Sequence, residues 1–418
     1  MRMTGLASAG SIDPGSVDLT DPFLFGEGEP HQVFAALRAM DGLHWQPAGE
    51  HGFWSVARHA DATTVLSDPD AYSSERGTIL GMLGLEDPAG RGQMAVTDPP
   101  RHALLRRPIG QPLRARTVAE HADRIRRQVR TLLAPAAAGA TLNFALAMME
   151  LSTSLAGLVL GLPEADWPGL TRLTTAAIAP DDPDYAAPGG REATLALAHR
   201  ELFAYFLDQV SERRKGAAGG HDLISVLMSI RMDDGEPMPD GAILANCYSL
   251  LMGASVTSPH VPSSTLLRLI ETGGYPGWAA DERRLTDGIE ESLRWASPAN
   301  HFMRYATRDL ELSGTKIRSG DAVVVWIGSA DRDERVFDDP HEFVIDRAPN
   351  PHLAFGAGPH YCVGHHAARQ TLRILFEEIG ATFDDFELAG PARHLCSNFV
   401  AGIKDLPVRA AVRKGARG

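Results

Sequence analysis

The residue with the clearest chemistry is Cys362, which lies in a glycine-rich loop before a helix-forming run. Residues 355–364 read FGAGPHYCVG, and the run extends over 366–379. Glycines let a backbone approach a flat ligand closely, and the N–H groups of a turn and a helix start stabilise a thiolate. Zinc and iron–sulfur clusters need several ligands, so a lone cysteine indicates neither. Two interpretations remain: a thiolate offered to one face of a metal cofactor, or a buried structural cysteine.

Residues 355–364 fit the pattern F-G-x-G-x-H-x-C-x-G at every fixed position, and in this the chain resembles the soluble bacterial cytochrome P450 family. The resemblance implies haem b, with the iron bound by the axial thiolate of Cys362. It also implies that Phe355 and Gly356 contact the haem and that His360 contacts a haem propionate.

A second group of residues has the family's spacing. Glu291 and Arg294 are three apart in a helical pattern that ends before Pro298, so they share a helix face. The pair resembles the family's E-x-x-R helix, and Arg347 matches the arginine of the meander that follows it. The implied role is structural: a buried network locks the cysteine loop, and breaking it prevents haem retention. A surface ion pair is the alternative interpretation.

Haem carries two propionates, which need cations. Residues 98–107 begin a helix with two prolines at its entrance, and His102 and Arg106 are four apart on one face. Both match the family's propionate-binding helix. Arg304 matches the arginine that reaches the propionates from the strand after the E-x-x-R helix. For each of these residues taken alone, the alternative is a solvated basic side chain.

The resemblance breaks in residues 250–260, LLMGASVTSPH, which align with the family's central helix over the haem. The family pattern there is A-G-x-(D/E)-T, in which the acid and the alcohol together deliver protons during oxygen activation. Thr257 keeps the alcohol, but Val256 stands at the acid position.

Two prolines then fall inside this helical pattern. Pro259 and Pro262 lack the N–H groups that carbonyls one turn earlier require, so we expect the helix to kink or open. Freed carbonyls can hold water, which gives one proton path through water, Thr257 and Ser258, reached by His260. Alternatively, a substrate carboxyl or hydroxyl supplies the missing group, the reaction needs no such delivery, or the acid is dispensable.

The substrate pocket is placed by position in the family pattern. The expected lining residues are Ile79, Met252, Val256, Ala299, Asn300 and Phe399. Most of them are apolar, which suits a largely hydrophobic ligand, and Asn300 can orient a polar substituent. Ordinary core packing is the alternative for each.

The resemblance implies a monooxygenase that inserts one oxygen atom from O2 into a small organic substrate, with natural-product tailoring in secondary metabolism as a compatible setting. We recognise no flavin or nicotinamide domain, so the electrons are expected from a separate ferredoxin or flavodoxin and its reductase. The missing acid leaves open an atypical haem-thiolate enzyme, driven by peroxide or catalysing coupling or nitrogen-oxide or nitrene-type chemistry. A non-catalytic haem binder is a third class, against which Thr257 and the complete cysteine loop argue.

Basic residues are expected around the cysteine side of the haem, where the family's acidic electron donor docks. They are Arg106, Arg107, Arg114, Arg116, His365, His366, Arg369 and Arg373. Complementary charge would steer this encounter and make it sensitive to salt. A scattered, solvated surface is the alternative.

Composition agrees with these expectations. The 418 residues are 44% hydrophobic, carry a net charge of −13 and contain three cysteines, which argues for a reducing compartment and against nucleic acid as a partner. The first 30 residues lack an apolar core, and residues 142–162 are interrupted by polar residues, so we expect a cytoplasmic protein without a membrane segment. No linker divides the chain: residues 1–20 are expected to be a flexible segment and 21–418 a single cytochrome P450 domain.

The expected fold is mainly α with a small β-sheet region, with the haem between the central helix and the helix after the cysteine loop. Strands are expected at 53–56 and 322–327. Helices are expected at 59–66, 114–133, 195–214, 241–253, 287–295 and 366–383.

Overall fold

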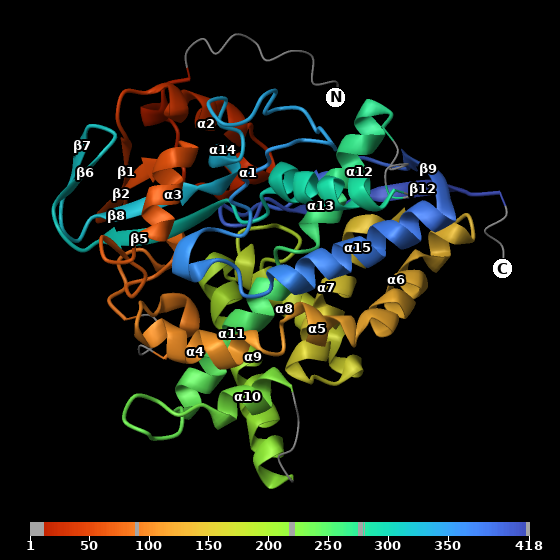
Figure 1. Ribbon diagram of the computed structural model, residues 1–418, viewed down its shortest axis with the longest axis horizontal. Helices are drawn as coiled ribbons and strands as arrows, with labels where there is room; N and C mark the ends of the chain where they lie inside the picture. Colours follow the sequence, from red (N-terminus) through yellow and green to blue (C-terminus); the bar gives the residue numbers. More distant parts are fainter. Residues whose placement is uncertain (1–11, 88–91, 217–221, 275–278, 280, 415–418) are drawn as a thin grey trace.

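The computed structural model describes residues 12–87, 92–216, 222–274, 279 and 281–414. Helices make up most of it, and the largest sheet lies at one end of the molecule (Figure 1). The expected mainly α fold with a small β region is therefore confirmed. In the described part of the chain, no helix is long and apolar enough to cross a membrane.

The α-helices are α1 (Pro22–Gly26), α2 (Pro30–Ala39), α3 (His59–Ser67), α4 (Arg101–Gly110), α5 (Ala115–Ala119), α6 (Ala122–Ala137), α7 (Phe144–Leu160), α8 (Trp167–Ile178), α9 (Gly190–Lys215), α10 (Leu223–Ser229), α11 (Asp240–Ser255), α12 (His260–Thr272), α13 (Glu282–Ala296), α14 (Ile327–Ala330) and α15 (His365–Thr382). Short 3-10 helices are η1 (Pro14–Ser16), η2 (Leu80–Met82), η3 (Met94–Val96), η4 (Glu164–Asp166) and η6 (Gly358–His360). The strands are β1 (His44–Ala48), β2 (His51–Val56), β3 (Tyr72–Ser73), β4 (Leu142–Asn143), β5 (His301–Ala306), β6 (Leu310–Leu312), β7 (Thr315–Ile317), β8 (Ala322–Trp326), β9 (Phe383–Leu388), β10 (Arg393–His394), β11 (Ile403–Asp405) and β12 (Pro407–Val412).

The five-stranded sheet has the order β1-β2-β8-β5-β3, in which β2 and β8 are parallel and the other neighbours are antiparallel. Its central strand β8 reads AVVVW and is buried along its whole length, as expected for β-branched residues covered on both faces. Trp326 at its end packs against Phe25 and Phe34, which fixes the N-terminal helices on the sheet. Both predicted strands are confirmed, and they pair with each other.

The helical core is built around α7, which is buried on most sides. Asn143 caps its start by accepting the N–H of Leu146, and Gly161 ends it with φ 73°, in the left-handed region that favours glycine. The interpretation of residues 142–162 as a core helix is confirmed. Helices α6, α8 and α11 pack against it.

Three predicted helices have other boundaries. The predicted helix at 114–133 is divided into α5 and α6 at residues 120–121, so it was wrong as one element. The helix predicted at 366–383 ends at Thr382, because Phe383 begins β9 and pairs with Val412. The central helical pattern is two helices, α11 and α12, separated by residues 256–259.

The chain start packs earlier than expected. Leu19, within the segment predicted to be flexible, is fully buried in the cluster that contains Phe34 and Trp326. Residues 1–11 lie outside the described residues. Packing of the domain therefore begins before residue 21.

Candidate functional site

The cysteine loop has a backbone shape that only its glycines permit. Gly356 and Gly358 have φ of 71° and 66°, and a Cβ on Gly358 would lie 2.5 Å from the carbonyl oxygen of Leu66. The Cys362 N–H donates to the carbonyl of Phe355 over 2.8 Å, which closes the loop just before α15. The loop thus presents the thiol from a fixed backbone.

The surroundings of Cys362 do not ionise it unaided. Burial raises the pKa of the Cys362 thiol, against the opposing effects of the Gly364 N–H, Arg106 and Arg369. The turn therefore favours the thiolate as expected, but its effect on the pKa of Cys362 is smaller than the opposing effect of burial. A metal cation bound to the sulfur would deprotonate it outright.

The cations predicted to bind propionates come together beside this loop. His102 and Arg106 from α4, Arg304 from β5 and His360 from the loop line one cavity, together with Gly356. The His102 and His360 rings lie 4.3 Å apart between centroids. Arg106 donates to the carbonyl of Tyr361, and Ser74 Oγ lies 3.2 Å from His360 Nε2.

The cavity holds more basic groups than its surroundings balance: its two arginines have no salt-bridge partner among the residues that the structure describes, and Asp98 acts on Arg304 and His102 through its charge alone. The buried Nε2 of His102 has no hydrogen-bond partner among the same residues. Burial lowers the pKa of Arg304 to about 10, and burial together with Arg106 lowers that of His102 to about 4. Buried basic groups without partners are costly, so the cavity suits an anionic ligand. A haem, with two propionates and an iron for Cys362, fits these residues.

The central helix α11 has an accessible face near its C-terminal end, which we call the open face. Gly253 is exposed although Leu251 and Met252 beside it are buried, and a Cβ at this position would meet no atom within 4 Å. Thr257 is partly exposed, and its Oγ1 donates to the Gly253 carbonyl over 2.9 Å. The small residue and the alcohol therefore share one accessible face.

Met252 and Val256 are buried and do not contribute to this accessible face. Both are buried in an apolar cluster with Ala177 near the end of α8, Ala198 of α9 and Val400. Phe399 packs against the same cluster. A carboxylate at position 256 would thus meet apolar side chains from α8 and α9, where nothing in the cluster would compensate its burial.

Two of the remaining predicted residues, Ala299 and Asn300, are bonded to the turn at residues 397–400. The Asn300 N–H donates to the Phe399 carbonyl over 2.7 Å, and its Nδ2 lies 3.5 Å from the Ser397 carbonyl. Ala299 forms a β-bridge with Val400. Asn300 is therefore engaged in holding this turn. Ile79, before η2, and Ser258, in the helix break, are partly exposed.

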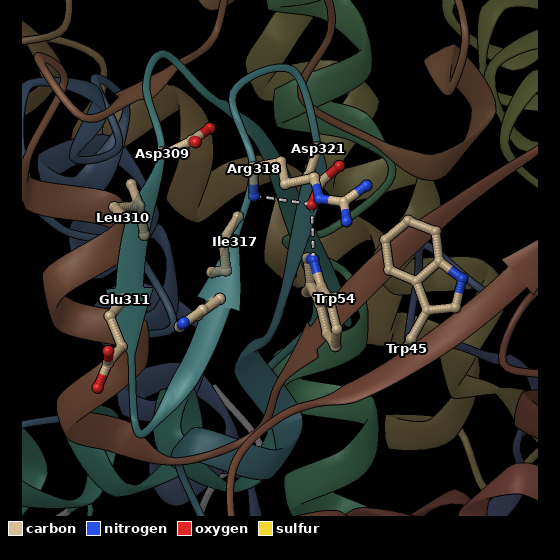
Figure 2. A pocket seen from close by; sticks show the side chains of 9 residues that line it. Trp45, Trp54, Asp309, Leu310, Glu311, Ile317, Arg318 and Asp321 are labelled. Atoms are coloured by element: carbon tan, nitrogen blue, oxygen red, sulfur yellow. Dashed lines mark hydrogen bonds between the residues drawn. The ribbon is translucent and has the colours of Figure 1, made fainter.

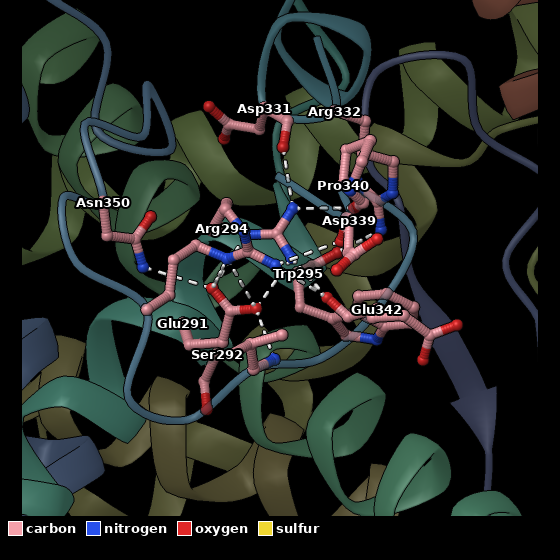
Figure 3. Close-up of polar contacts among 12 residues, drawn as sticks. Glu291, Ser292, Arg294, Trp295, Asp331, Arg332, Asp339, Pro340, Glu342 and Asn350 are labelled. Carbon is pink, nitrogen blue, oxygen red and sulfur yellow. Dashed lines mark hydrogen bonds and ion pairs between the residues drawn. The ribbon is translucent and has the colours of Figure 1, made fainter. Parts of the chain in front are cut away.

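The Glu291 carboxylate is the centre of a buried network (Figure 3). It accepts hydrogen bonds from Arg294 at 2.7 and 2.8 Å, and Arg347 and Asn350 donate to it as well. Arg294 also donates to the carbonyls of Asp331, Pro340 and Glu342. The side chains of Glu291 and Arg294 have no exposed surface. Helix α13 is thereby bonded to the segment that leads into the cysteine loop.

The basic face is smaller than expected. Arg369 pairs with Glu290 at 2.7 Å and lies over the Phe355 ring, and Arg373 pairs with Glu282. Both cations are therefore largely neutralised. The predicted cations that stay exposed and form no ion pair among the described residues are Arg107, Arg114, Arg116 and His366.

Two polar links near the loop were missed from the sequence. Glu290 joins Arg369 of α15 to His352, and Asp98 accepts from Ser73 Oγ and the Ser74 N–H. Asp98 carried a signal, because it precedes a helix start. Glu290 carried none, because its partners are far away in sequence.

A second cavity, of about 660 Å³, lies at the far edge of the sheet (Figure 2). It is lined by Trp45 and Trp54 and by the β6–β7 hairpin, and Trp54 Nε1 donates to Asp321 over 3.0 Å. None of the predicted site residues lines it. Cavity volume alone would therefore have favoured this cavity over the one beside the cysteine loop.

Comparisons with known proteins agree with this geometry. Residues 284–389 match the family model described as "Cytochrome P450". The chain is 34% identical to cytochrome P450 NovI of Streptomyces niveus, over 94% of this chain and 96% of that protein. It is 30% identical to linalool 8-monooxygenase of Pseudomonas putida, over 94% and 98%. The crystal structure of P450 OxyD, described as involved in the biosynthesis of vancomycin-type antibiotics, superposes with a TM-score of 0.83 at 31% identity, covering 95% of this chain and 100% of that one.

Proposed function

The chain belongs to the cytochrome P450 family of oxidoreductases, and we propose that it is a haem-thiolate monooxygenase that inserts one oxygen atom from O2 into a small, largely hydrophobic substrate. The observation that carries the proposal is the cavity beside Cys362, where Arg106 and Arg304 form no ion pair with the described residues and the buried Nε2 of His102 has no hydrogen-bond partner. An anionic, iron-containing cofactor satisfies both the cations and the thiol.

The roles of the protein groups follow from their positions. Haem b, when bound, supplies the activation of dioxygen at its iron. Cys362 would bind the iron, while His102, Arg106, Arg304 and His360 would hold the propionates. These contacts fix the orientation of the cofactor against the open face of α11.

Thr257 is the polar group best placed to handle a proton on that face. Its hydroxyl hydrogen is donated to the Gly253 carbonyl, so its oxygen lone pairs stay available to accept a hydrogen bond from water or substrate. Ser258, the next residue, is partly exposed and extends this polar edge. We assign the two hydroxyls to proton handling, with Thr257 nearer the open face.

The substrate class follows from the apolar surroundings and from the relatives. Phe302, Met94 and Val363 line the cofactor cavity. Linalool 8-monooxygenase is named for a small organic molecule and OxyD is described by an antibiotic pathway. Tailoring of a largely apolar natural product is the corresponding proposal here.

Atypical haem-thiolate chemistry is the second candidate, and Val256 favours it. The acid position is occupied by a buried apolar side chain, and the cluster around it contains no carboxylate. Reactions driven by peroxide, or couplings without the usual proton delivery, would not need a carboxylate at position 256.

Reconstitution with a ferredoxin, its reductase and NAD(P)H separates the two candidates. We expect substrate to accelerate NAD(P)H consumption, with product oxygen derived from O2, because the chain must receive its electrons one at a time from outside. Isotopically labelled O2 and product mass spectrometry measure this. Product formed with peroxide, and none with NAD(P)H and O2, would select the atypical enzyme.

The remaining exposed cations predict where the electron donor docks. We expect turnover with an acidic ferredoxin to fall as ionic strength rises, because opposite charges steer the encounter. Arg114→Glu and Arg116→Glu should each raise the KM for ferredoxin by roughly tenfold at low salt. Lys316→Glu, the same charge change beside the far cavity, is the matched control. Equal effects of all three, or a flat salt response, would contradict docking at this face.

A further inference from the structure

The central helix is interrupted where it passes the open face. Helix α11 ends at Ser255 and α12 begins at His260. Between them the N–H of His260 donates to the Thr257 carbonyl over 3.2 Å, in place of the carbonyl four residues back. Pro259 has no N–H to donate. The carbonyls of Ser255 and Val256 therefore lose the backbone donors that a continuous helix would give them.

Pro262 contributes less to the interruption than the sequence suggested. It lies in the first turn of α12, where backbone N–H groups have no helical partner in any case. Pro259 therefore accounts for the interruption of the helix, and the contacts that residues 256–260 make with other elements help to hold the break in place.

The His260 side chain connects the helix break to strand β11. Its side chain is buried, and its Nδ1 accepts the N–H of Ile403 in β11 over 3.2 Å. Burial lowers the pKa of His260 to about 4, so the ring is neutral near neutral pH. This argues against the expected role of His260 in relaying protons, because the ring is buried and its Nδ1 is bonded to the backbone of β11.

The strand on the other side of the ring is firmly anchored. Lys404, next to Ile403, pairs with both carboxylate oxygens of Asp182 at 2.6 and 2.8 Å, and Asp182 is fully buried. Asp182 also accepts the N–H of Cys396. Strand β11 is thereby fixed to the connection between α8 and α9, so the N–H of Ile403 is a fixed point for the ring.

Gly402 lies close against the ring. A Cβ at Gly402 would lie 3.0 Å from both Cε1 and Nε2 of His260. A glycine at this position therefore lets β11 approach the helix break closely enough for the hydrogen bond at Ile403.

We propose that His260 is a positioning residue that ties the helix break to β11 and thereby holds Thr257 on the open face, where the proposed oxygenation needs its hydroxyl. The proposal rests on the proposed function and adds a residue to it. A histidine that merely filled the core would add stability alone. His260 is the first residue of α12, three residues after Thr257, so its removal should change the geometry of the break as well.

The test uses the haem-loaded protein and four variants. His260→Leu removes the polar contacts and keeps the volume, whereas His260→Gln keeps one donor and one acceptor. Gly402→Ala presses on the ring without removing it. Thr265→Val is the stability control, because it deletes a buried hydroxyl bonded to the Val261 carbonyl one turn further along α12.

Two readouts are measured: hydrogen exchange of the amides in residues 253–262, and product formed per NAD(P)H consumed. We expect His260→Leu to keep the thiolate spectrum, to speed exchange at the break and to lower the product yield about tenfold, since small misplacements near the chemistry are costly. His260→Gln should restore part of both, Gly402→Ala should change both in the direction of His260→Leu, and Thr265→Val should change neither.

The outcomes are distinguishable. If His260→Leu matches Thr265→Val in exchange at the break and in product yield, the ring only fills the core and the proposal is overturned. If His260→Leu does not fold, Gly402→Ala decides by the same two readouts. If wild-type protein gives no NAD(P)H-dependent product, the proposed function fails, while the exchange data still decide the role of His260.

Discussion

Cys362→Ser protein should bind haem weakly and lose NAD(P)H-driven oxygenation to the background rate. The substitution leaves the loop geometry intact, because the bond from the residue 362 N–H to Phe355 and the φ of Gly356 and Gly358 involve backbone alone. Only the sulfur changes. A hydroxyl at this place is a far poorer anionic ligand than a thiolate, and the basic residues proposed to bind the propionates would not replace the ligand of the iron.

The measurement is the optical spectrum of the reduced, carbon monoxide-bound protein. Wild-type protein should show the red-shifted band of thiolate ligation, and Cys362→Ser, Cys362→Ala and Cys362→His should not. Cys247→Ser is the matched control: Cys247 is also buried, burial raises its pKa to about 12, and it lies on α11 outside the cavity beside the loop. A Cys362 variant that kept both the thiolate band and the activity would refute the assignment of the ligand.

The parts of the site that the sequence predicted are those set by short spacings. His102 and Arg106 share a face because they are four apart on one helix, and the cysteine loop has its shape because glycines occupy its left-handed positions. These relations involve residues close together in sequence, so they do not depend on packing between distant segments. The same holds for Glu291 and Arg294 on α13.

The parts that the sequence did not predict depend on packing between distant segments. The rotation of α11, which turns Val256 towards α8 and α9 and leaves Gly253 open, follows from apolar contacts with Ala177, Ala198 and Val400. The neutralisation of Arg369 by Glu290 joins two helices that share no sequence signal. A cation count along the chain therefore overestimated the docking face.

Helix ends show the same limit. Apolar periodicity ran through residues 114–133 and 366–383, yet the chain breaks at 120–121 in one case and turns into β9 at Phe383 in the other. In β9 the N-terminal residue is fully buried and pairs with β12, so tertiary pairing overrides the helical pattern. The break after Ser255 was expected from Pro259, but its anchor in β11 lies more than a hundred residues away.

The second large effect is expected for Glu291→Ala, which should leave the protein unable to retain haem. Removing this carboxylate strands Arg294 and Arg347, both buried, without the anion they share. Breaking a buried pair by deleting one partner costs about 3–5 kcal/mol, and a whole domain is stable by only about 5–15 kcal/mol. The backbone N–H of Val344 and the amide of Asn350 lose their acceptor as well, so the segment before the cysteine loop loses part of its attachment to α13.

Glu291→Gln separates charge from hydrogen bonding within this network. It keeps an acceptor for the Val344 N–H but removes the negative charge. The free energy of unfolding of Glu291→Gln should therefore lie between that of the wild type and that of Glu291→Ala. Asp287→Asn on the same helix is the control: its ion pair with Arg283 is exposed at 3.8 Å, and its loss should cost less than about 1 kcal/mol. Urea unfolding and haem content after purification measure both effects. If Glu291→Ala unfolded at the same urea concentration as Asp287→Asn with full haem content, the network would not hold the loop.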